Sequence, residues 1–296
     1  MLRLVVVPVI LAVLAIGAVC VAYGVLIERR AYRLVRRELA ILPTDGPAEL
    51  TILHLSDLHF VRRDERKTRF LGSLPRADIT VVTGDFLAEP EGVEVAVASV
   101  APTRGRLASW YVLGSNDYYV PGPINPFAYL AGPSNRRHRS AKRGRARDLI
   151  AGLDRDGWAN LTNVRREVDL DGLPVELLGL DDAHIRKQDV RIAPRRATAR
   201  LGLAVMHSPD SLPEAVACGY ELVVAGHTHG GQVRMPFVGA LVTNSRLPRR
   251  VASGLFRMGD ALVHVSRGLG TNKYAPFRFL CRPEATMLVL TRVAQQ

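Results

Sequence analysis

The chain has 296 residues, of which 48% are hydrophobic and 23% charged, a composition typical of a globular protein. Its three cysteines are too few for a disulfide framework, which excludes the small disulfide-stabilised secreted proteins. The net charge is +12, but residues 1–40 hold six arginines against two glutamates and residues 134–147 hold seven basic residues and no acid. The rest of the chain is therefore nearly neutral, unlike a nucleic-acid coat protein, which is basic throughout.

The first predicted element is an apolar segment at the N-terminus. Residues 4–27 include no charged side chain and, at about 1.5 Å per residue, an α-helix of this length spans roughly 36 Å. A bilayer core is about 30 Å thick, so the segment is long enough to cross it. A cleaved signal peptide is the alternative, but its apolar core is usually only about 7–15 residues long. We therefore predict an uncleaved transmembrane anchor over residues 1–28.

The basic residues behind this segment indicate its orientation. Five arginines lie between positions 29 and 37, whereas only Arg3 and the amino terminus precede the apolar run. The positive-inside rule predicts a single-pass protein of the cell membrane whose C-terminal domain faces the cytoplasm. Ala31–Leu42 is interpreted as a short basic amphipathic helix or linker that ends at turn formers, so residues 29–48 are predicted to be a juxtamembrane linker.

From Glu49 onward, short apolar runs end in polar residues, a pattern typical of strands buried on both faces. The predicted strands are residues 50–55, 79–83, 110–113, 176–180, 201–206, 222–225, 262–266 and 286–291. Segments between them are long enough for helices, for example Val93–Ala101. Polar residues able to bind metal follow these strands repeatedly, at the strand ends where open α/β sheets place their sites.

The candidate metal ligands are a mixed set of carboxylates, imidazoles and one amide: Asp57, His59, Asp85, Asn116 (or Ser115), His207, His227 and His229. Such a set suits borderline divalent ions such as manganese, iron or zinc. Two ions about 3.5–4 Å apart need a bridging anion, which a carboxylate can supply. In the D-x-H and H-x-H pairs, side chains two residues apart on extended backbone point the same way, so both can face one ion.

These stretches resemble the calcineurin-like metallophosphoesterases. The matching blocks are Asp57-Leu58-His59, Gly84-Asp85, Gly114-Ser115-Asn116-Asp117, His207 and the string GHTHGGQ at residues 226–232. That string, together with SRGLGT at residues 266–271, is similar to the bacterial membrane-associated branch of the family. The resemblance covers about residues 49–291 and implies a metallophosphoesterase domain over residues 49–296. The implied fold class is α/β, a four-layer α/β-β/α sandwich with two packed mixed sheets.

The resemblance also implies a role for each ligand. Six side chains bind the metals: Asp57, His59 and His229 the first, His207 and His227 the second, and Asp85 both. An amide oxygen from the third block completes the second site. A metal-bound hydroxide then attacks phosphorus in line with the leaving oxygen.

The third block departs from the family pattern, which is G-N-H-D or G-N-H-E with a metal-binding Asn and a His that assists the leaving group. Either Ser115 takes the metal position and Asn116 replaces the histidine, or the loop shifts so that Asn116 supplies the amide oxygen. We favour the second because an amide oxygen is a better neutral ligand than a hydroxyl. Both interpretations lose the histidine, and asparagine cannot act as a general acid.

Asn116 and Asp117 are the candidate catalytic residues of this block, and Asp117 is expected to support the ligands. Without a general acid, a substrate with a good leaving group is favoured, such as a phosphodiester or a lipid-linked pyrophosphate. Among nearby polar residues, His54 is interpreted as a core histidine or as one that supports a ligand, Asp181-Asp182 as turn caps and Asp210 as a helix N-cap. His138 and His184 are expected to be exposed, and Arg267 is assigned either to a substrate phosphate or to a structural salt bridge.

The leading hypothesis is a phosphohydrolase acting at the membrane surface, with the lipid bilayer and a phosphate-bearing small molecule or lipid as partners. The basic segment 134–147 is either a site for anionic groups or a solvated loop. One alternative is a nuclease or cyclic-nucleotide phosphodiesterase, but no aromatic residues interleave with the basic segment to stack bases. Another is a metal-binding non-enzyme with a decayed site, which the retention of six other ligand candidates disfavours.

Overall fold

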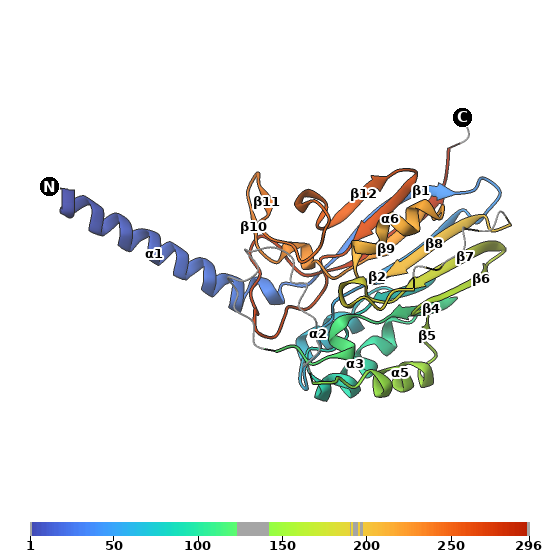
Figure 1. Cartoon of the computed structure of the whole chain (residues 1–296), viewed down its shortest axis with the longest axis horizontal. Helices are drawn as coiled ribbons and strands as arrows, with labels where there is room; N and C mark the ends of the chain where they lie inside the picture. The colour runs from blue at the N-terminus through green and yellow to red at the C-terminus, as the bar shows by residue number, and fades with distance from the viewer. Residues whose placement is uncertain (1, 123–141, 190, 192–194, 196–197, 295–296) are drawn as a thin grey trace.

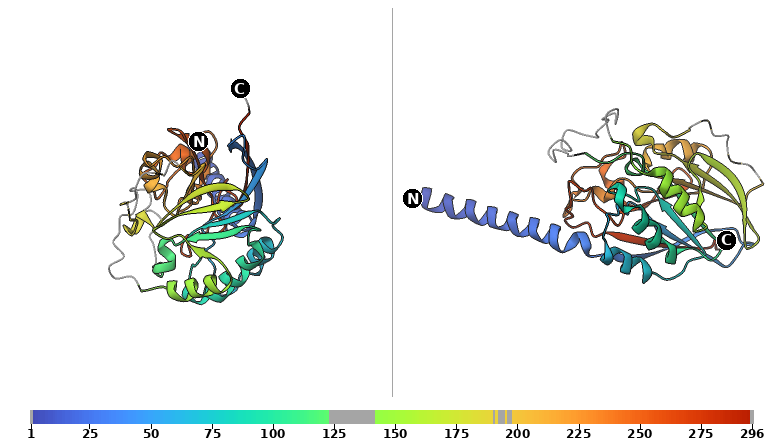
Figure 2. Two further views of the ribbon diagram at one scale, coloured as in Figure 1. Left: turned by 90° about the vertical axis from the view of Figure 1, so that its right-hand side faces the viewer. Right: turned by 90° about the horizontal axis from the view of Figure 1, so that it is seen from below.

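The computed structural model describes residues 2–122, 142–189, 191, 195 and 198–294. Within these residues, two six-stranded sheets pack face to face and carry helices on their outer faces (Figure 1). One long helix, α1 (Leu2–Leu26), projects from one end of the domain, and the C-terminus lies at the opposite end (Figures 1 and 2).

The first sheet has the strand order β1-β14-β2-β3-β4-β5. Its strands are β1 (Arg33–Leu42), β2 (Glu49–Leu55), β3 (Ile79–Thr83), β4 (Ala108–Val112), β5 (Ala159–Asn160) and β14 (Glu284–Arg292). Strands β2 to β5 are parallel, β14 is antiparallel to β2, and β1 lies parallel to β14 at the sheet edge. All five residues of β3 are buried, as expected for a β-branched strand covered on both faces.

The second sheet has the order β12-β13-β9-β8-β7-β6. Its strands are β6 (Val164–Leu170), β7 (Leu173–Leu180), β8 (Leu201–Met206), β9 (Leu222–Ala225), β12 (Gly254–Met258) and β13 (Ala261–Val265). The inner four strands are parallel and the two edge strands antiparallel, so both sheets are mixed. A separate small hairpin consists of β10 (Arg234–Met235) and β11 (Gly239–Ala240).

Helices form the two outer layers. The helices α2 (Glu65–Gly72), α3 (Val93–Val100) and α5 (Ala146–Arg155) cover the first sheet, and α6 (Leu212–Ala217) covers the second (Figures 1 and 2). Separate apolar clusters fill the space under each helical layer and between the two sheets. The four-layer α/β-β/α sandwich implied by the resemblance is therefore confirmed.

Short turns connect these elements. The helix α4 (Ser115–Tyr118) follows β4 directly. The 3₁₀ turns are η1 (Glu28–Arg30), η2 (Pro90–Gly92), η3 (Ala101–Thr103), η5 (Ala183–Ile185), η6 (Pro209–Ser211), η7 (His229–Gly231) and η8 (Arg249–Val251).

The eight predicted strands correspond to β2, β3, β4, β7, β8, β9, β13 and β14, and the predicted helix at Val93–Ala101 corresponds to α3. The helix or linker expected at Ala31–Leu42 is wrong, because residues 33–42 form β1. The otherwise free edge of β14 takes up this segment and pairs its backbone groups, which overrides local preference. Arg33 also donates to Glu284 at 2.8 Å. Most of the basic segment, residues 134–141 with His138, lies outside the described residues.

The helix α1 is the one element among the described residues that is long and apolar enough to cross a bilayer. Its apolar side chains from Val6 to Leu26 are largely exposed, whereas those of the strands are buried. The helix therefore contributes little to the core of the domain.

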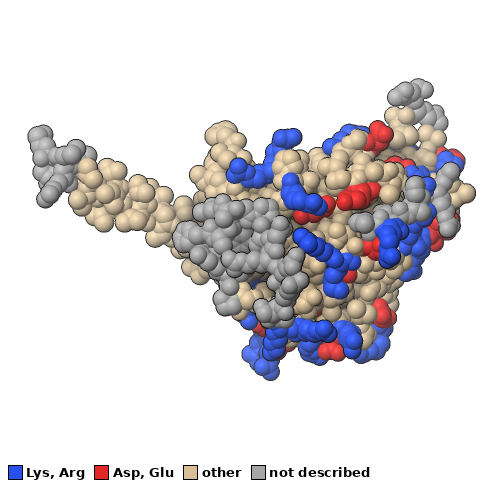
Figure 3. All heavy atoms as spheres, viewed as in Figure 1, with Lys and Arg blue, Asp and Glu red and all other residues tan. Residues whose placement is uncertain are grey.

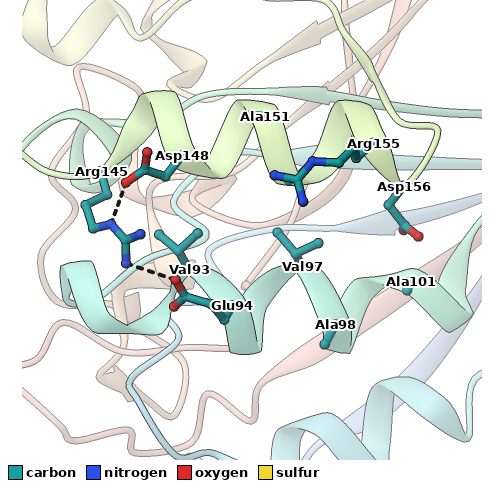
Figure 4. A pocket seen from close by; sticks show the side chains of 11 residues that line it. Val93, Glu94, Val97, Ala98, Ala101, Arg145, Asp148, Ala151, Arg155 and Asp156 are labelled. Carbon is teal, nitrogen blue, oxygen red and sulfur yellow. Dashed lines mark hydrogen bonds and ion pairs between the residues drawn. The ribbon is translucent and has the colours of Figure 1, made fainter.

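A groove of about 390 Å³ lies in the outer helical layer between α3 and α5 (Figure 4). At one end, Arg145 pairs with Asp148 at 2.6 Å and with Glu94 at 3.1 Å. Farther along, Val97 packs so closely on Gly152 that a Cβ there would lie 2.8 Å from its methyl group. None of the candidate metal ligands lines this groove, so it is separate from the site described next.

Candidate metal centre

The candidate ligands converge because the parallel strands of both sheets end at the same side of the sandwich. Asp57 follows β2 and Asp85 follows β3 in the first sheet, whereas His207 follows β8 and His227 follows β9 in the second. Backbone hydrogen bonds join the loops, from Asp57 N–H to the Gly84 carbonyl at 3.0 Å and from Gly226 N–H to the His207 carbonyl at 2.9 Å. The strand ends thus hold side chains that lie as much as 170 residues apart, such as His59 and His229.

The backbone at these ligands is left-handed, a conformation that is uncommon for residues other than glycine. Five ligands have a positive φ: Asp57 (49°), His59 (45°), Asp85 (53°), His227 (70°) and His229 (51°). The expectation of extended backbone in the D-x-H and H-x-H pairs is therefore wrong. Such strain persists where surrounding contacts enforce it, and it concentrates at functional sites.

Two glycines let these loops approach each other closely. A Cβ on Gly226 would lie 1.8 Å from the Ser56 hydroxyl oxygen, and a Cβ on Gly114 would lie 2.3 Å from a carboxylate oxygen of Asp85. Any larger residue at either position would push the ligand loops apart.

The first cluster consists of Asp57, His59 and His229, whose ligand atoms all lie within 4.8 Å of one another. The Nε2 atoms of His59 and His229 are 3.2 Å apart, and His229 Nε2 is 3.5 Å from Asp57 Oδ1. The Asp57 carboxylate is fixed by the His227 N–H at 3.0 Å and by the Ser56 hydroxyl at 2.5 Å.

The second cluster consists of Asp85 and His207, whose ligand atoms lie within 4.8 Å of each other and of Asp57, together with His227 beside them. Each histidine donates one ring N–H to a carbonyl: His207 Nδ1 to Thr83 at 2.7 Å and His227 Nε2 to Asn244 at 2.9 Å. The remaining nitrogens, His207 Nε2 and His227 Nδ1, lie 3.2 Å apart and carry lone pairs that can bind metal. The H-x-H pair therefore serves two clusters, because His227 belongs to the second and His229 to the first.

Asp85 lies between the clusters. Its Oδ2 is 3.5 Å from His59 Nε2, and its Oδ1 is 3.6 Å from His207 Nε2. Asn116 reaches the same carboxylate, with its N–H 2.8 Å from Oδ1 and its Nδ2 2.5 Å from Oδ2. Asp117 faces the other way and accepts from the Asp85 and Gly114 N–H groups at 3.0 and 2.9 Å, so it supports the loops.

The geometry fits a pair of divalent ions. Donor atoms bound about 2.1 Å from one ion lie roughly 3.0–3.4 Å from one another, close to the separations within and between these clusters. Imidazole and carboxylate donors in this proportion are also the ligands that borderline divalent ions take. The residues present therefore match the dinuclear metal centre that the family typically binds.

The charges of the site favour bound cations. Burial opposes a charge on His207, but Asp85, Asp182 and Asp57 outweigh it and raise its pKa to about 10. A metal ion would be attracted by the same carboxylates. Burial raises the pKa of Asp117 to about 8, with a further contribution from the negative charge of Asp85.

The sequence predictions missed residues that act on the ligands through tertiary contacts. Lys67 is buried and donates to the Leu58 carbonyl at 2.5 Å, which fixes the loop before His59. The buried Arg278 guanidinium donates to the Arg267 and Gly270 carbonyls at 2.8 and 2.6 Å. No sequence signal marks either residue, because the chain brings them to the site from outside the ligand blocks.

Arg278 also lies behind the first cluster, with Nη2 3.4 Å from His229 Nδ1. Burial, His59 and Arg278 hold the pKa of His229 well below its usual value. Asp182 lies behind the second cluster. One of its oxygens caps η5 by accepting from His184 N–H at 2.8 Å, as the turn-cap prediction expected, while its other oxygen is buried without a partner among the described residues.

The remaining sequence interpretations have mixed outcomes. His54 is a buried core histidine, as predicted, and contacts His264 at 2.8 Å. His184 is not a simply exposed residue, because its ring lies 4.7 Å from that of His227. Asp210 is not the N-cap: Ser208 caps η6, and Asp210 instead accepts from Ser245 at 2.6 Å.

Arg267, assigned to a phosphate or a salt bridge, has its Nε 3.8 Å from a carboxylate oxygen of Glu284, which is an ion pair. This contact is compatible with the structural alternative. Its side chain is about a quarter exposed, at 24%.

A profile of the calcineurin-like phosphoesterases matches residues 50–231, more than half of the chain. The chain belongs to this family and is a metallophosphoesterase, a hydrolase of phosphoester bonds.

Three relatives show the range of the similarity. YkuE, an uncharacterized metallophosphoesterase of Bacillus subtilis, is 27% identical over 80% of this chain and 76% of its own length. Phosphodiesterase YaeI of Escherichia coli is 28% identical over 88% of each chain. UDP-2,3-diacylglucosamine pyrophosphatase LpxG of Chlamydia trachomatis is 26% identical over 81% of this chain and 83% of its own.

Proposed function

We propose that this chain is a membrane-anchored phosphohydrolase that splits a phosphodiester or a lipid-linked pyrophosphate with two divalent metal ions. The observation that carries the proposal is the shared carboxylate of Asp85, which presents one oxygen to His59 and the other to His207. An anion in this position can bridge two ions, and a pair of ions can stabilise both the attacking and the leaving oxygen of an in-line displacement at phosphorus.

We infer that the ligands divide as the clusters do. Asp57, His59 and His229 would hold the first ion, His207, His227 and Asn116 would hold the second, and Asp85 would contact both. Bound there, divalent cations supply a water of lowered pKa and neutralise phosphate charge, and manganese, iron or zinc suits these donors. The hydrogen bonds from His207 and His227 to carbonyls fix the ring orientation that such binding needs.

The leaving group follows from the histidine that is missing from the third block. Asn116 donates to the Asp85 carboxylate from its backbone N–H and from its side-chain amide nitrogen, so the amide lies beside the shared carboxylate. We assign the ligand role to the oxygen of this amide rather than to the Ser115 hydroxyl, because an amide oxygen is the better neutral ligand. Asparagine cannot protonate a leaving oxygen, so a phosphodiester or pyrophosphate, whose leaving group is already a weak base, is the preferred substrate. The relative YaeI is named a phosphodiesterase and the relative LpxG a UDP-2,3-diacylglucosamine pyrophosphatase, which supports a phosphodiester and a lipid-linked pyrophosphate as the two substrate classes.

The exposed apolar surface of α1 supports a membrane anchor. The arginines that follow it support a catalytic domain on the cytoplasmic side. A membrane tether brings the site to substrates that are themselves lipids or carry lipid chains.

The test is turnover by the full chain in detergent, loaded in turn with manganese, iron, zinc or cobalt. Five substrates are compared: bis-p-nitrophenyl phosphate, p-nitrophenyl phosphate, a simple alkyl phosphomonoester, an oligonucleotide and a lipid-linked pyrophosphate. We expect the diester or the pyrophosphate to be turned over fastest. Faster turnover of a simple alkyl monoester, cleavage of oligonucleotides alone, or absence of a tightly held divalent ion would each contradict the proposal.

A variant that restores the family block tests the leaving-group step. Ser115→Asn combined with Asn116→His should raise turnover of alkyl phosphomonoesters by about a hundredfold, the lower part of the range for general-acid catalysis. Turnover of bis-p-nitrophenyl phosphate should change little, because its leaving group needs no proton. The single variant Ser115→Asn is the matched control and should not gain monoester turnover.

A further inference from the structure

The β10–β11 hairpin, residues 234–240, exposes an apolar tip that the fold does not use. Phe237 is fully exposed at 109%, and its neighbours Val238 and Met235 are 65% and 45% exposed. Burying such an aromatic side chain is favourable, and this stabilisation is lost while the side chain stays in water. The tip carries no charged residue and projects from the same end of the domain as α1 (Figures 1 and 3).

The base of the hairpin pairs with the loop of residues 277–281, whose Arg278 contacts the ligand His229. Phe279 donates its N–H to the Gln232 carbonyl and accepts from the Arg234 N–H, both at 2.9 Å. Gln232 directly follows η7, which begins at the ligand His229. The hairpin and the first cluster are therefore fixed to each other by a few residues of chain and by this loop.

The same loop holds the base of α1. The ring of Phe279 meets that of Tyr23 edge-on with centroids 6.4 Å apart, and a Cβ on Gly24 would lie 2.2 Å from the neighbouring Phe277 ring. Just beyond the helix, the buried carboxylate of Glu28 accepts from the Leu280 N–H at 2.9 Å. The anchor and the hairpin are thus two projections from one rigid base.

Cations surround the foot of the hairpin. Arg234 donates to the Gly230 carbonyl at 3.1 Å, and Arg249 donates to the Leu241 carbonyl just after β11 at 2.7 Å. Arg249 and Arg250 are exposed, and basic side chains lie beside the uncharged tip in Figure 3. The tip is apolar and the arginines lie at its foot. This order matches a bilayer interface, in which the apolar acyl chains lie deeper than the phosphate headgroups.

We propose that the tip residues Pro236, Phe237 and Val238 insert into the bilayer interface beside α1, so that the domain grips one membrane surface at two points. This proposal rests on the proposed anchoring by α1, because the continuity of the hairpin with the helix base selects a bilayer as the occupant. A second copy of the chain is disfavoured, since three side chains are far smaller than the roughly 1,200 Å² that stable protein interfaces bury.

This placement has a consequence for the substrate. The loop 277–281 contacts both the membrane-facing elements and the first cluster, so the metal centre lies close to the headgroup layer. A phosphate ester in that layer reaches the centre without leaving the membrane. The substrate class is therefore a membrane lipid, or a lipid-linked pyrophosphate, with its phosphate at headgroup depth.

The experiment uses the full chain in vesicles of phosphatidylcholine and phosphatidylglycerol, with or without brominated acyl chains. Phe237→Trp places a reporter at the tip, while the native Trp110 and Trp158 are both buried in the domain and supply a constant background. Val293→Trp is the matched control, because Val293 is 43% exposed near the C-terminus at the opposite end of the domain. We expect blue-shifted, bromine-quenched emission from Phe237→Trp and neither effect from the control.

Flotation of the vesicles separates the two proposals. If the protein does not float with them, the anchoring by α1 is overturned. If it floats but Phe237→Trp is quenched no more than Val293→Trp, only the hairpin proposal fails. A blue shift without bromine quenching shows a protein contact at the tip, such as a second copy, and also overturns the bilayer as occupant.

A second measurement tests the consequence for turnover. Phe237→Ser combined with Val238→Ser should raise the KM for a vesicle-embedded lipid pyrophosphate about three- to tenfold, since interfacial affinity scales with buried apolar area. Turnover of soluble bis-p-nitrophenyl phosphate should be unchanged, which also shows that the variant folds. An unchanged KM for the lipid substrate would contradict the role of the hairpin.

Discussion

The first and second clusters contain the same kinds of donor, yet the residues behind them carry opposite charges. Arg278 lies behind the first cluster and adds its positive charge to burial and His59, which together hold the pKa of His229 well below its usual value. Asp182 lies behind the second and, with Asp85 and Asp57, raises the pKa of His207 against the effect of burial. We therefore predict that the second cluster binds a cation more tightly than the first.

On this prediction, the charges behind the ligands help to set metal affinity in this fold. One buried guanidinium and one buried carboxylate would make the two sites unequal. Metal titration of the chelator-treated protein should therefore resolve a tight and a weaker class of site.

The largest expected effect comes from breaking both sites at once. Asp85→Asn removes the carboxylate shared by the clusters. Losing several kcal/mol of its charge stabilisation in the transition state corresponds to about a thousandfold loss in kcat/KM. Steady-state kinetics with bis-p-nitrophenyl phosphate and the bound metal content measure this loss. The control Asp148→Asn, on the exposed face of α5, should stay within about twofold. Full activity in Asp85→Asn would rule out the bridging role.

Removal of the Arg278 guanidinium behind the first cluster should lower the stability of the fold strongly. Arg278→Met leaves the carbonyls of Arg267, Gly270 and Cys281 buried without donors, which we expect to cost about 3 kcal/mol of unfolding free energy. Chemical denaturation measures this, with the exposed Arg282→Met as control. In the folded fraction the weaker metal class should bind more tightly, and weaker binding there would refute the repulsion from Arg278.

Removal of the carboxylate behind the second cluster should act mainly on metal binding. Asp182→Asn should lower the affinity of the tight class about tenfold, within the range for groups that support metal ligands. Calorimetric titration with manganese or zinc measures the change, and Asp189→Asn, an exposed carboxylate paired with Arg191, is the control. Equal loss in both metal classes would show that Asp182 acts on the fold instead.

The smallest effect concerns the histidine pair that joins the two sheets beneath both clusters. Burial and His264 lower the pKa of His54 well below 6.5, and burial and Arg37 lower that of His264 to about 3. As the pH falls, these two histidines therefore take up protons at a higher pH in the unfolded chain than in the folded protein. The stabilisation is present above about pH 6.5 and is lost as the pH falls, by about 1 kcal/mol per histidine over the next pH unit.

Chemical denaturation of chelator-treated protein across this pH range checks the prediction. His54→Gln combined with His264→Gln removes both titrating groups and should flatten the dependence. An equal slope in the wild type and the variant would assign the effect to other groups.

The ligand loops could be predicted from the sequence because their signals are local. A buried apolar run followed by Asp57 or His207 defines both the strand and the position of the ligand at its end. The left-handed backbone at these residues could not be predicted, since it arises from neighbouring loops that approach through Gly114 and Gly226.

Residues that act through distant contacts left no local signal. Arg278 acts by donating to carbonyls of a distant turn, such as that of Arg267. Asp182 acts through its charge on His207, which follows another strand. The strand β1 was misread for the same reason, because its partner β14 lies about 250 residues away. Its arginines suggested a membrane-proximal helix, whereas the free edge of the sheet determined a strand.

The pairing of β1 with β14 constrains biosynthesis. The segment just after α1 leaves the ribosome early, but its hydrogen-bonding partner is the last strand of the sheet to be made. Until translation reaches that strand, β1 has no β14 to pair with, and the sheet edge closes only after almost the whole chain has been made. A ribosome stalled shortly before residue 284 would thus leave a chain whose first strand lacks its partner.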